Sequence, residues 1–61
     1  MEKDVWLYEW SFKDNEGDLY EDSRETKSEA LAEIKKQRAD DCQIVETWIY
    51  KNGEFKGRFQ W

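Results

Sequence analysis

The 61-residue sequence contains no histidine and only one cysteine, Cys42. Without histidine, the commonest general base and the Ser–His and Cys–His nucleophile pairs are absent, and the usual zinc ligand sets cannot be assembled. One cysteine cannot form an intrachain disulfide. Cys42 is expected at the start of a strand, facing the core, where a thiol acts as a small apolar side chain rather than as a nucleophile. We therefore expect a non-enzymatic protein with no metal and no cofactor.

Glycine and long apolar segments are also scarce. Gly17, Gly53 and Gly57 are isolated, so there is no glycine-rich loop for phosphate. No apolar run approaches the ~18 residues of a membrane-spanning helix. Met1–Asp4 lacks the basic-then-apolar pattern of a signal peptide, and a lone cysteine fits a reducing compartment. These absences predict a cytoplasmic protein that does not bind a membrane.

Aromatic residues supply most of the material for a core. Residues 1–61 form one small domain, near the lower size limit for a chain that folds alone. A single aromatic side chain can bury roughly 150–250 Å². The ten aromatic residues are Trp6, Tyr8, Trp10, Phe12, Tyr20, Trp48, Tyr50, Phe55, Phe59 and Trp61. Together they could build a core that the few aliphatic residues could not.

The N-terminal part of the sequence predicts a hairpin. Val5–Phe12 alternates as a strand does, with one wholly aromatic face. That face holds Trp6, Tyr8, Trp10 and Phe12. Asp14–Asp18 has the composition of a turn, and Gly17 in it can adopt positive φ. Leu19–Arg24 returns as a polar strand, which we expect at a sheet edge because its charges would deter the addition of another strand.

A helix is predicted to follow, from Lys27 to Asp40. Thr26 and Glu29 have the spacing of a capping box, in which the threonine hydroxyl accepts from the Glu29 amide and the glutamate reaches back. Ala30, Leu31 and Ile34 then repeat at helical spacing and form a narrow apolar stripe. No glycine follows the helix, so the sequence does not indicate how it ends.

Cys42–Lys51 is predicted to form a third strand, joined to a fourth by Asn52-Gly53, the strongest short signal for a two-residue type I′ turn. The register expected from this turn pairs Tyr50 with Phe55, Trp48 with Gly57, Glu46 with Phe59 and Ile44 with Trp61. It would place Ile44, Trp48, Tyr50, Phe55, Phe59 and Trp61 on the face covered by the helix. The expected fold is α+β, a single four-stranded antiparallel sheet in the order ββαββ, with one helix packed on its aromatic face.

Asp14, Glu16 and Asp18 invite comparison with a calcium-binding loop. An EF-hand has ligands at alternate positions, glycine at the sixth and glutamate at the twelfth. Counted from Asp14, the twelfth residue is Glu25, but the sixth is Leu19. The match is partial, and a solvated turn explains the segment better.

The net charge of −5 is distributed unevenly. Residues 1–25 hold nine acidic and three basic residues, a balance of −6, whereas residues 26–61 hold six acidic and seven basic residues, a balance of +1. Such asymmetry can steer a protein toward a basic partner and disfavours phosphate as the main ligand. The candidate binding residues are Asp14, Glu16, Asp18, Glu21 and Asp22. The hypothesis is a small acidic module, like a phage-encoded inhibitor, that imitates the phosphates of DNA and occupies a basic, nucleic-acid-binding surface of another protein.

Some aromatic rings are expected to stay exposed. A helix of about 14 residues is about 21 Å long and cannot cover four strands of bulky rings. Rings at the sheet ends, Trp6, Tyr20 and Trp61, are the candidates, and tryptophan and tyrosine are common interface anchors. Two alternatives remain open: nucleic-acid binding by stacking on the sheet, which normally needs a basic groove, and a homodimeric or adaptor domain.

Replacement of Gly53 by valine tests the predicted turn. A β-branched residue resists positive φ, so the substitution should lower the free energy of unfolding by at least ~1 kcal/mol. Chemical denaturation of the variant and the wild type measures the difference. An unchanged midpoint would contradict a type I′ turn at this position.

Overall fold

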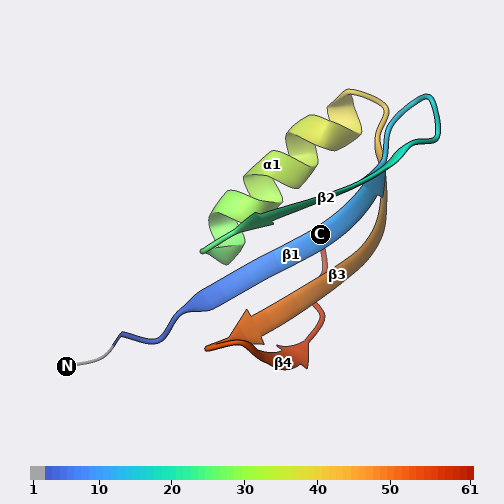
Figure 1. The fold of residues 1–61 in the computed structure, drawn as a ribbon. Coiled ribbons are helices and arrows are strands. Elements are labelled where there is room, and N and C mark those ends of the chain that lie inside the picture. Colours follow the sequence, from blue (N-terminus) through green and yellow to red (C-terminus); the bar gives the residue numbers. More distant parts are fainter. Residues whose placement is uncertain (1–2) are drawn as a thin grey trace.

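Four strands and one helix follow one another as β1, β2, α1, β3 and β4 (Figure 1). The computed structural model describes residues 3–61. The elements are β1 (Trp6–Lys13), β2 (Leu19–Arg24), α1 (Lys27–Ala39), β3 (Gln43–Lys51) and β4 (Glu54–Gly57). All strands pair antiparallel in one sheet of order β2-β1-β3-β4, with β2 at an edge. The predicted ββαββ fold is confirmed.

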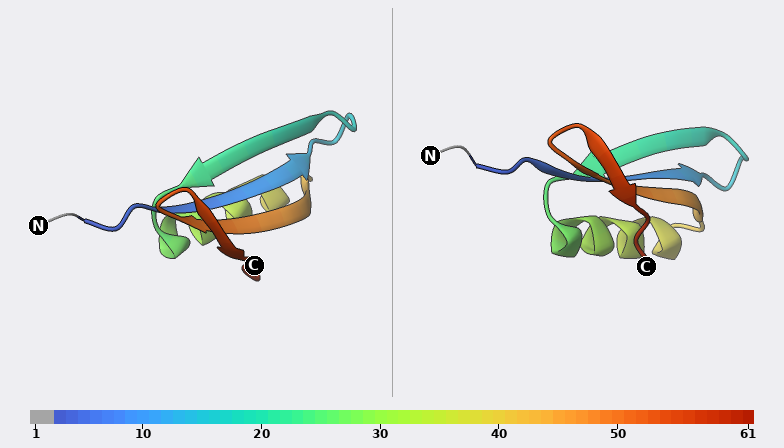
Figure 2. Two further views of the ribbon diagram at one scale, coloured as in Figure 1. Left: turned by 60° about the horizontal axis from the view of Figure 1, so that its bottom comes forward. Right: turned by 90° about the horizontal axis from the view of Figure 1, so that it is seen from below.

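The molecule has two layers. Helix α1 lies along one face of the sheet and contacts β1, β2 and β3 (Figure 2). Within residues 3–61, no helix covers the opposite face, which we call the uncovered face. In the same described part of the chain, no helix is long and apolar enough to cross a membrane.

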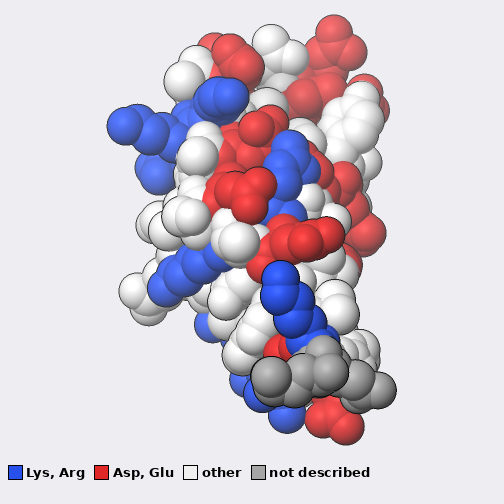
Figure 3. Space-filling view, turned by 90° about the vertical axis from the view of Figure 1, so that its left-hand side faces the viewer, with Lys and Arg blue, Asp and Glu red and all other residues white. Residues whose placement is uncertain are grey.

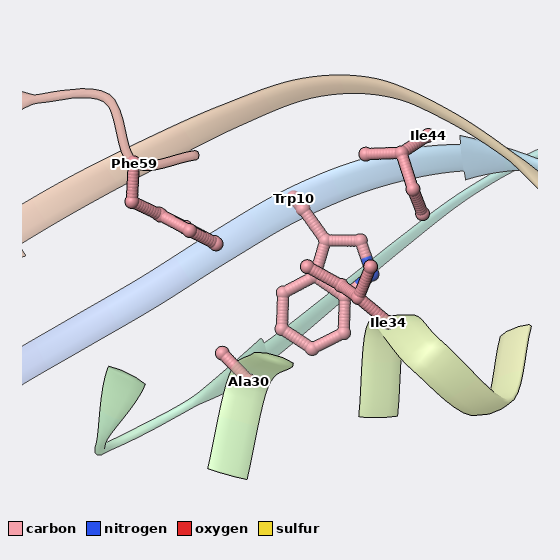
Figure 4. Close-up of a cluster of buried hydrophobic side chains, with 5 residues drawn as sticks. All are labelled: Trp10, Ala30, Ile34, Ile44 and Phe59. Carbon is pink, nitrogen blue, oxygen red and sulfur yellow. The ribbon is translucent and has the colours of Figure 1, made fainter. Parts of the chain in front are cut away.

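Trp10, at the centre of β1, forms the middle of the core. Its side chain is completely buried and packs with Ala30 and Ile34 of α1, Ile44 of β3 and Phe59 of the C-terminal segment (Figure 4). Because a buried indole N–H needs an acceptor, its position also depends on a polar contact. Trp10 Nε1 donates to Gln37 Oε1 at 2.8 Å.

Both ends of α1 are capped. Glu29 N donates to the Thr26 hydroxyl at 3.2 Å, as predicted, and Glu29 Oε1 accepts from that hydroxyl at 2.8 Å. At the other end, Asp41 takes the left-handed conformation, with φ 64°. Asp41 N donates to Arg38 O at 3.2 Å and Cys42 N to Gln37 O at 3.0 Å. These two bonds form a Schellman motif with aspartate where glycine is usual, and the helix ends at Ala39.

The turn between β3 and β4 matches the prediction. Asn52 and Gly53 have φ values of 52° and 83°, as type I′ requires, and Tyr50 pairs with Phe55. A Cβ added at Gly53 would meet nothing within 4 Å, so a substitution there strains only the backbone.

The register predicted beyond this turn is wrong. A bulge leaves Lys56 unpaired, so Gly57 pairs with Ile49 and not with Trp48. β4 ends at Gly57, and the expected pairs Glu46–Phe59 and Ile44–Trp61 do not form within the described sheet.

A second bulge changes which face of β3 meets the helix. Phe12 pairs with Ile44 and Ser11 with Glu46, so Val45 is an extra residue. Since paired residues share a face, the residues opposite Trp10 and Tyr8 lie on the helix side. These residues are Thr47 and Ile49. Trp48, Tyr50 and Phe55, expected under the helix, therefore lie on the uncovered face; strict alternation failed because the sequence does not mark the bulge.

Thr47 holds the C-terminal segment to the sheet in place of further strand pairing. Its hydroxyl donates to Phe59 O at 2.6 Å and accepts from Phe59 N at 3.2 Å, and Thr47 is only 3% exposed. One side chain therefore satisfies both backbone groups of a core residue.

Replacing Thr47 with valine keeps the shape and leaves both Phe59 backbone groups without this partner. We expect the free energy of unfolding to fall by about 1–3 kcal/mol. Thr47→Ser retains the hydroxyl and is the control, with a smaller loss from the missing methyl group. Urea denaturation measures both variants. A valine variant at least as stable as the serine variant would contradict this role.

Candidate protein-binding surface

The β1–β2 turn is built around Asp14. Its Oδ1 accepts from Glu16 N and from Asp18 N, each at 2.9 Å, and Gly17 adopts φ 87°. Glu16 and Asp18 are exposed. Oxygen atoms of the three carboxylates lie within 4.8 Å of one another. The turn thus concentrates negative charge, and the Asp14 carboxylate also accepts hydrogen bonds from the backbone of the turn.

The connection from α1 to β3 lies at the same end of the molecule as this turn (Figures 1 and 2). It contributes Asp40 and Asp41, both exposed. Cys42, the last residue of this connection, is half-buried and lies near charges of both segments. Burial, then the charges of Asp40, Asp14 and Asp41, raise the pKa of the Cys42 thiol above its ordinary value.

We call the set Asp14, Glu16, Asp18, Asp40 and Asp41 the acidic end. The sequence indicated its first three members, but Asp40 and Asp41 join them only through the fold. In Figure 3, acidic side chains are frequent at the top and along the right of the view, and others lie in the middle and at the bottom among basic side chains. On this face, acidic side chains are thus dense toward the top without being confined to it.

Asp40 and Asp41 occupy positions that do not favour aspartate. They follow the C-terminus of α1, where the helix dipole is negative and favours cations. Asp41 also takes a left-handed conformation that glycine adopts at less cost. Stability alone does not explain why acids stand here.

The other two predicted acidic residues lie elsewhere. Glu21 is exposed on the uncovered face, opposite Ser11. Asp22 lies on the helix side and is engaged internally: it accepts from Arg24 Nη1 at 2.6 Å and from Gln37 Nε2 at 3.2 Å. Asp22 therefore joins β2 to α1 through these contacts.

The three predicted rings are exposed but do not form one surface. Trp6, Tyr20 and Trp61 are 38%, 48% and 51% exposed. Tyr20 stacks on Phe12 at 5.7 Å beside the acidic end, where the charges of Asp14 and Asp18 raise its pKa. Trp6 lies at the opposite end of β1, with Lys51 Nζ 5.3 Å from its ring centre. Of the three rings, Tyr20 is thus placed beside the acidic end.

The chain matches no protein-family model, no curated protein and no solved structure.

The thiol of Cys42 should react slowly. Only the thiolate is nucleophilic, and a raised pKa lowers the thiolate fraction at any given pH. The rate of alkylation by iodoacetamide should therefore rise with pH along a curve displaced to higher pH than that of free cysteine. Asp40→Asn should move this curve part of the way back, whereas Glu54→Gln on β4 should leave it in place.

The measurement is the pH dependence of the alkylation rate, followed by mass spectrometry. A curve that lies at the same pH as that of free cysteine, or at lower pH, would contradict the raised pKa of Cys42. It would also restore Cys42 as a candidate nucleophile.

Proposed function

We propose that this protein is a non-enzymatic, cytoplasmic protein-binding module whose acidic end docks on a basic surface of another protein. The observation that carries the proposal is the placement of Asp40 and Asp41, in positions where stability disfavours acids, beside the acidic turn. Groups retained against stability are typical of functional sites. Such a charge distribution accelerates encounter with a partner of opposite charge.

The favoured partner surface is one that binds nucleic acid. Duplex DNA carries about one negative charge per 1.7 Å of its axis, so proteins that bind it present closely spaced cations. At the β1–β2 turn, three carboxylates have oxygens within 4.8 Å of one another. A rigid turn with this charge density could occupy such a groove. The module would then act as an inhibitor of the phage-encoded type.

Direct binding of nucleic acid fits the geometry less well. Stacking requires several rings along a basic groove. Tyr20 lies beside Asp14 and Asp18, whose charges would repel phosphates, and Trp6 lies at the other end of the sheet. These positions favour a protein partner.

The acidic end can be neutralised without disturbing the fold. The pair Glu16→Gln and Asp18→Asn removes two exposed charges whose side chains make no hydrogen bond within residues 3–61, and it leaves Asp14 to hold the turn. The control pair, Glu25→Gln and Glu54→Gln, removes two exposed charges from other parts of the surface. Both pairs change the net charge equally.

The partner is first isolated from a lysate, and its association with each variant is then measured at several salt concentrations. Neutralising the acidic end should slow association about 3- to 10-fold at low salt, and the difference should shrink as salt rises. The control pair should have a much smaller effect. DNA should compete with this protein for the partner.

Equal association rates for the two pairs would contradict docking through the acidic end. Binding of single-stranded DNA at physiological salt, lost in Trp61→Ala, would support the nucleic-acid alternative. A self-associating chain with no other partner would support the homodimer.

A further inference from the structure

The uncovered face has an apolar end and an acidic middle. At the apolar end, Leu7 of β1 pairs with Tyr50 of β3, which pairs with Phe55 of β4. Phe55 is 56% exposed, and Val5, just before β1, is 63% exposed. The Tyr50 and Phe55 rings meet edge to face, with centroids 5.9 Å apart. Apolar side chains from three neighbouring segments thus form a continuous patch without a helix above it.

A shallow hollow of about 270 Å³ opens in this patch. Its lining is apolar apart from one carboxylate: Val5, Leu7, Tyr50 and Gly53 surround it together with Glu9. Glu9 is half-buried between Ser23 and Trp48 on the neighbouring strands. No lysine or arginine among residues 3–61 lies within ion-pair distance of it.

Further acids lie on the uncovered face beyond Glu9. The row that follows Ser23, Glu9 and Trp48 along the strands contains Glu21, Ser11 and Glu46, and both glutamates are exposed. Lys13, the basic residue that follows on this face, is one row farther from the hollow. A group bound in the hollow would therefore contact one carboxylate, Glu9, with two more carboxylates farther along the same face.

From this arrangement we propose that the uncovered face binds a segment of a partner protein that inserts an apolar side chain into the hollow and sets a lysine or arginine against Glu9. The apolar side chain would cover Leu7 and Tyr50, and the cation would neutralise a carboxylate that is already partly removed from water. This contact rests on the proposed function in one respect, that the occupant is a protein. It uses a different surface from the acidic end.

Charge argues against a second copy of this chain as the occupant. Face-to-face stacking of two sheets would bring Glu9, Glu21 and Glu46 of each copy toward those of the other. Like charges at a desolvated contact are costly. A basic segment meets the same carboxylates favourably.

The test uses the intact protein, labelled with ¹⁵N, and a short peptide of leucine and lysine as the probe. Two matched peptides, leucine with glutamate and serine with lysine, keep one half of the chemistry each. We expect the leucine–lysine peptide to shift the amide resonances of Leu7, Glu9, Trp48 and Tyr50. It should bind at least about 5-fold more tightly than either matched peptide.

Two substitutions locate the contact, each with a control. Glu9→Gln should weaken binding of the leucine–lysine peptide about 2- to 5-fold, whereas Glu33→Gln on the helix side should not. Phe55→Ser should weaken it by a similar factor, whereas Leu19→Ser, a comparably exposed residue at the far end of the same face, should not. Both Glu9→Gln and Phe55→Ser alter side chains outside the buried core, so the fold should persist, and the amide spectrum verifies it.

Shifts confined to Asp14–Asp18, or equal binding of the serine–lysine peptide, would overturn the proposal. So would shifts that grow with protein concentration alone, which would make a second copy the occupant. These failures are separable from failure of the proposed function. They leave the association test of Glu16→Gln and Asp18→Asn unaffected.

Discussion

A fully buried indole in β1, an inner strand of the sheet, is the contact on which the arrangement of the other elements depends. Trp10 loses all contact with water, so its N–H must find an acceptor inside the protein. Gln37 of α1 supplies the acceptor, and the same side chain then donates to Asp22 of β2. A chain of two hydrogen bonds thus joins β1, α1 and β2. It fixes the height of the helix along the sheet, which a narrow apolar stripe would leave loosely defined.

The same hydrogen bonds help to explain how a core with few aliphatic residues can hold the helix on the sheet. Ala30 and Ile34 are the buried residues of α1, and one turn later the stripe continues with a polar residue, Gln37. Arg24 adds to the arrangement: it lies over the Trp10 ring at 6.0 Å and contacts Glu33 of α1 at 3.6 Å. Polar side chains therefore enclose the indole where aliphatic ones are lacking. Acidic residues are therefore of two kinds: some, such as Asp22, make contacts within the fold, and others face solvent.

The local signals in the sequence predicted local structure well. The Asn52-Gly53 turn, the Thr26 cap and the polar edge strand all formed as expected, because each depends on residues that are neighbours in the chain. The helix exit at Asp41 was not predicted, since aspartate seldom replaces glycine there. The faces of β3 were also wrong. Bulges depend on how two strands fit together, and nothing in residues 43–51 alone marks Val45 as extra.

The candidate surface, too, could be predicted from the sequence only in part. Glu16 and Asp18 could be identified from the sequence because a turn exposes its side chains. Asp40 and Asp41 could not be linked to them, since the distance between two loops depends on the packing of α1 against the sheet. Trp48 and Tyr50 were assigned to the wrong face because the bulge was missed, so strand alternation placed only Val5 and Leu7 of the apolar patch on the uncovered face.

The bulge at Val45 has a consequence for how this chain could change over evolution. Ile44 faces the helix and Glu46 faces away, so a chain lacking Val45 would restore simple alternation and keep every later residue of β3 on its present face. A deletion at this position would be absorbed locally, whereas a deletion between Thr47 and Lys51 would move the residues on one side of it to the opposite face. Loss of the extra residue would also relax the added twist that a bulge brings. β3 can therefore lose one residue at Val45 while the later residues of the strand stay on the faces that they now occupy.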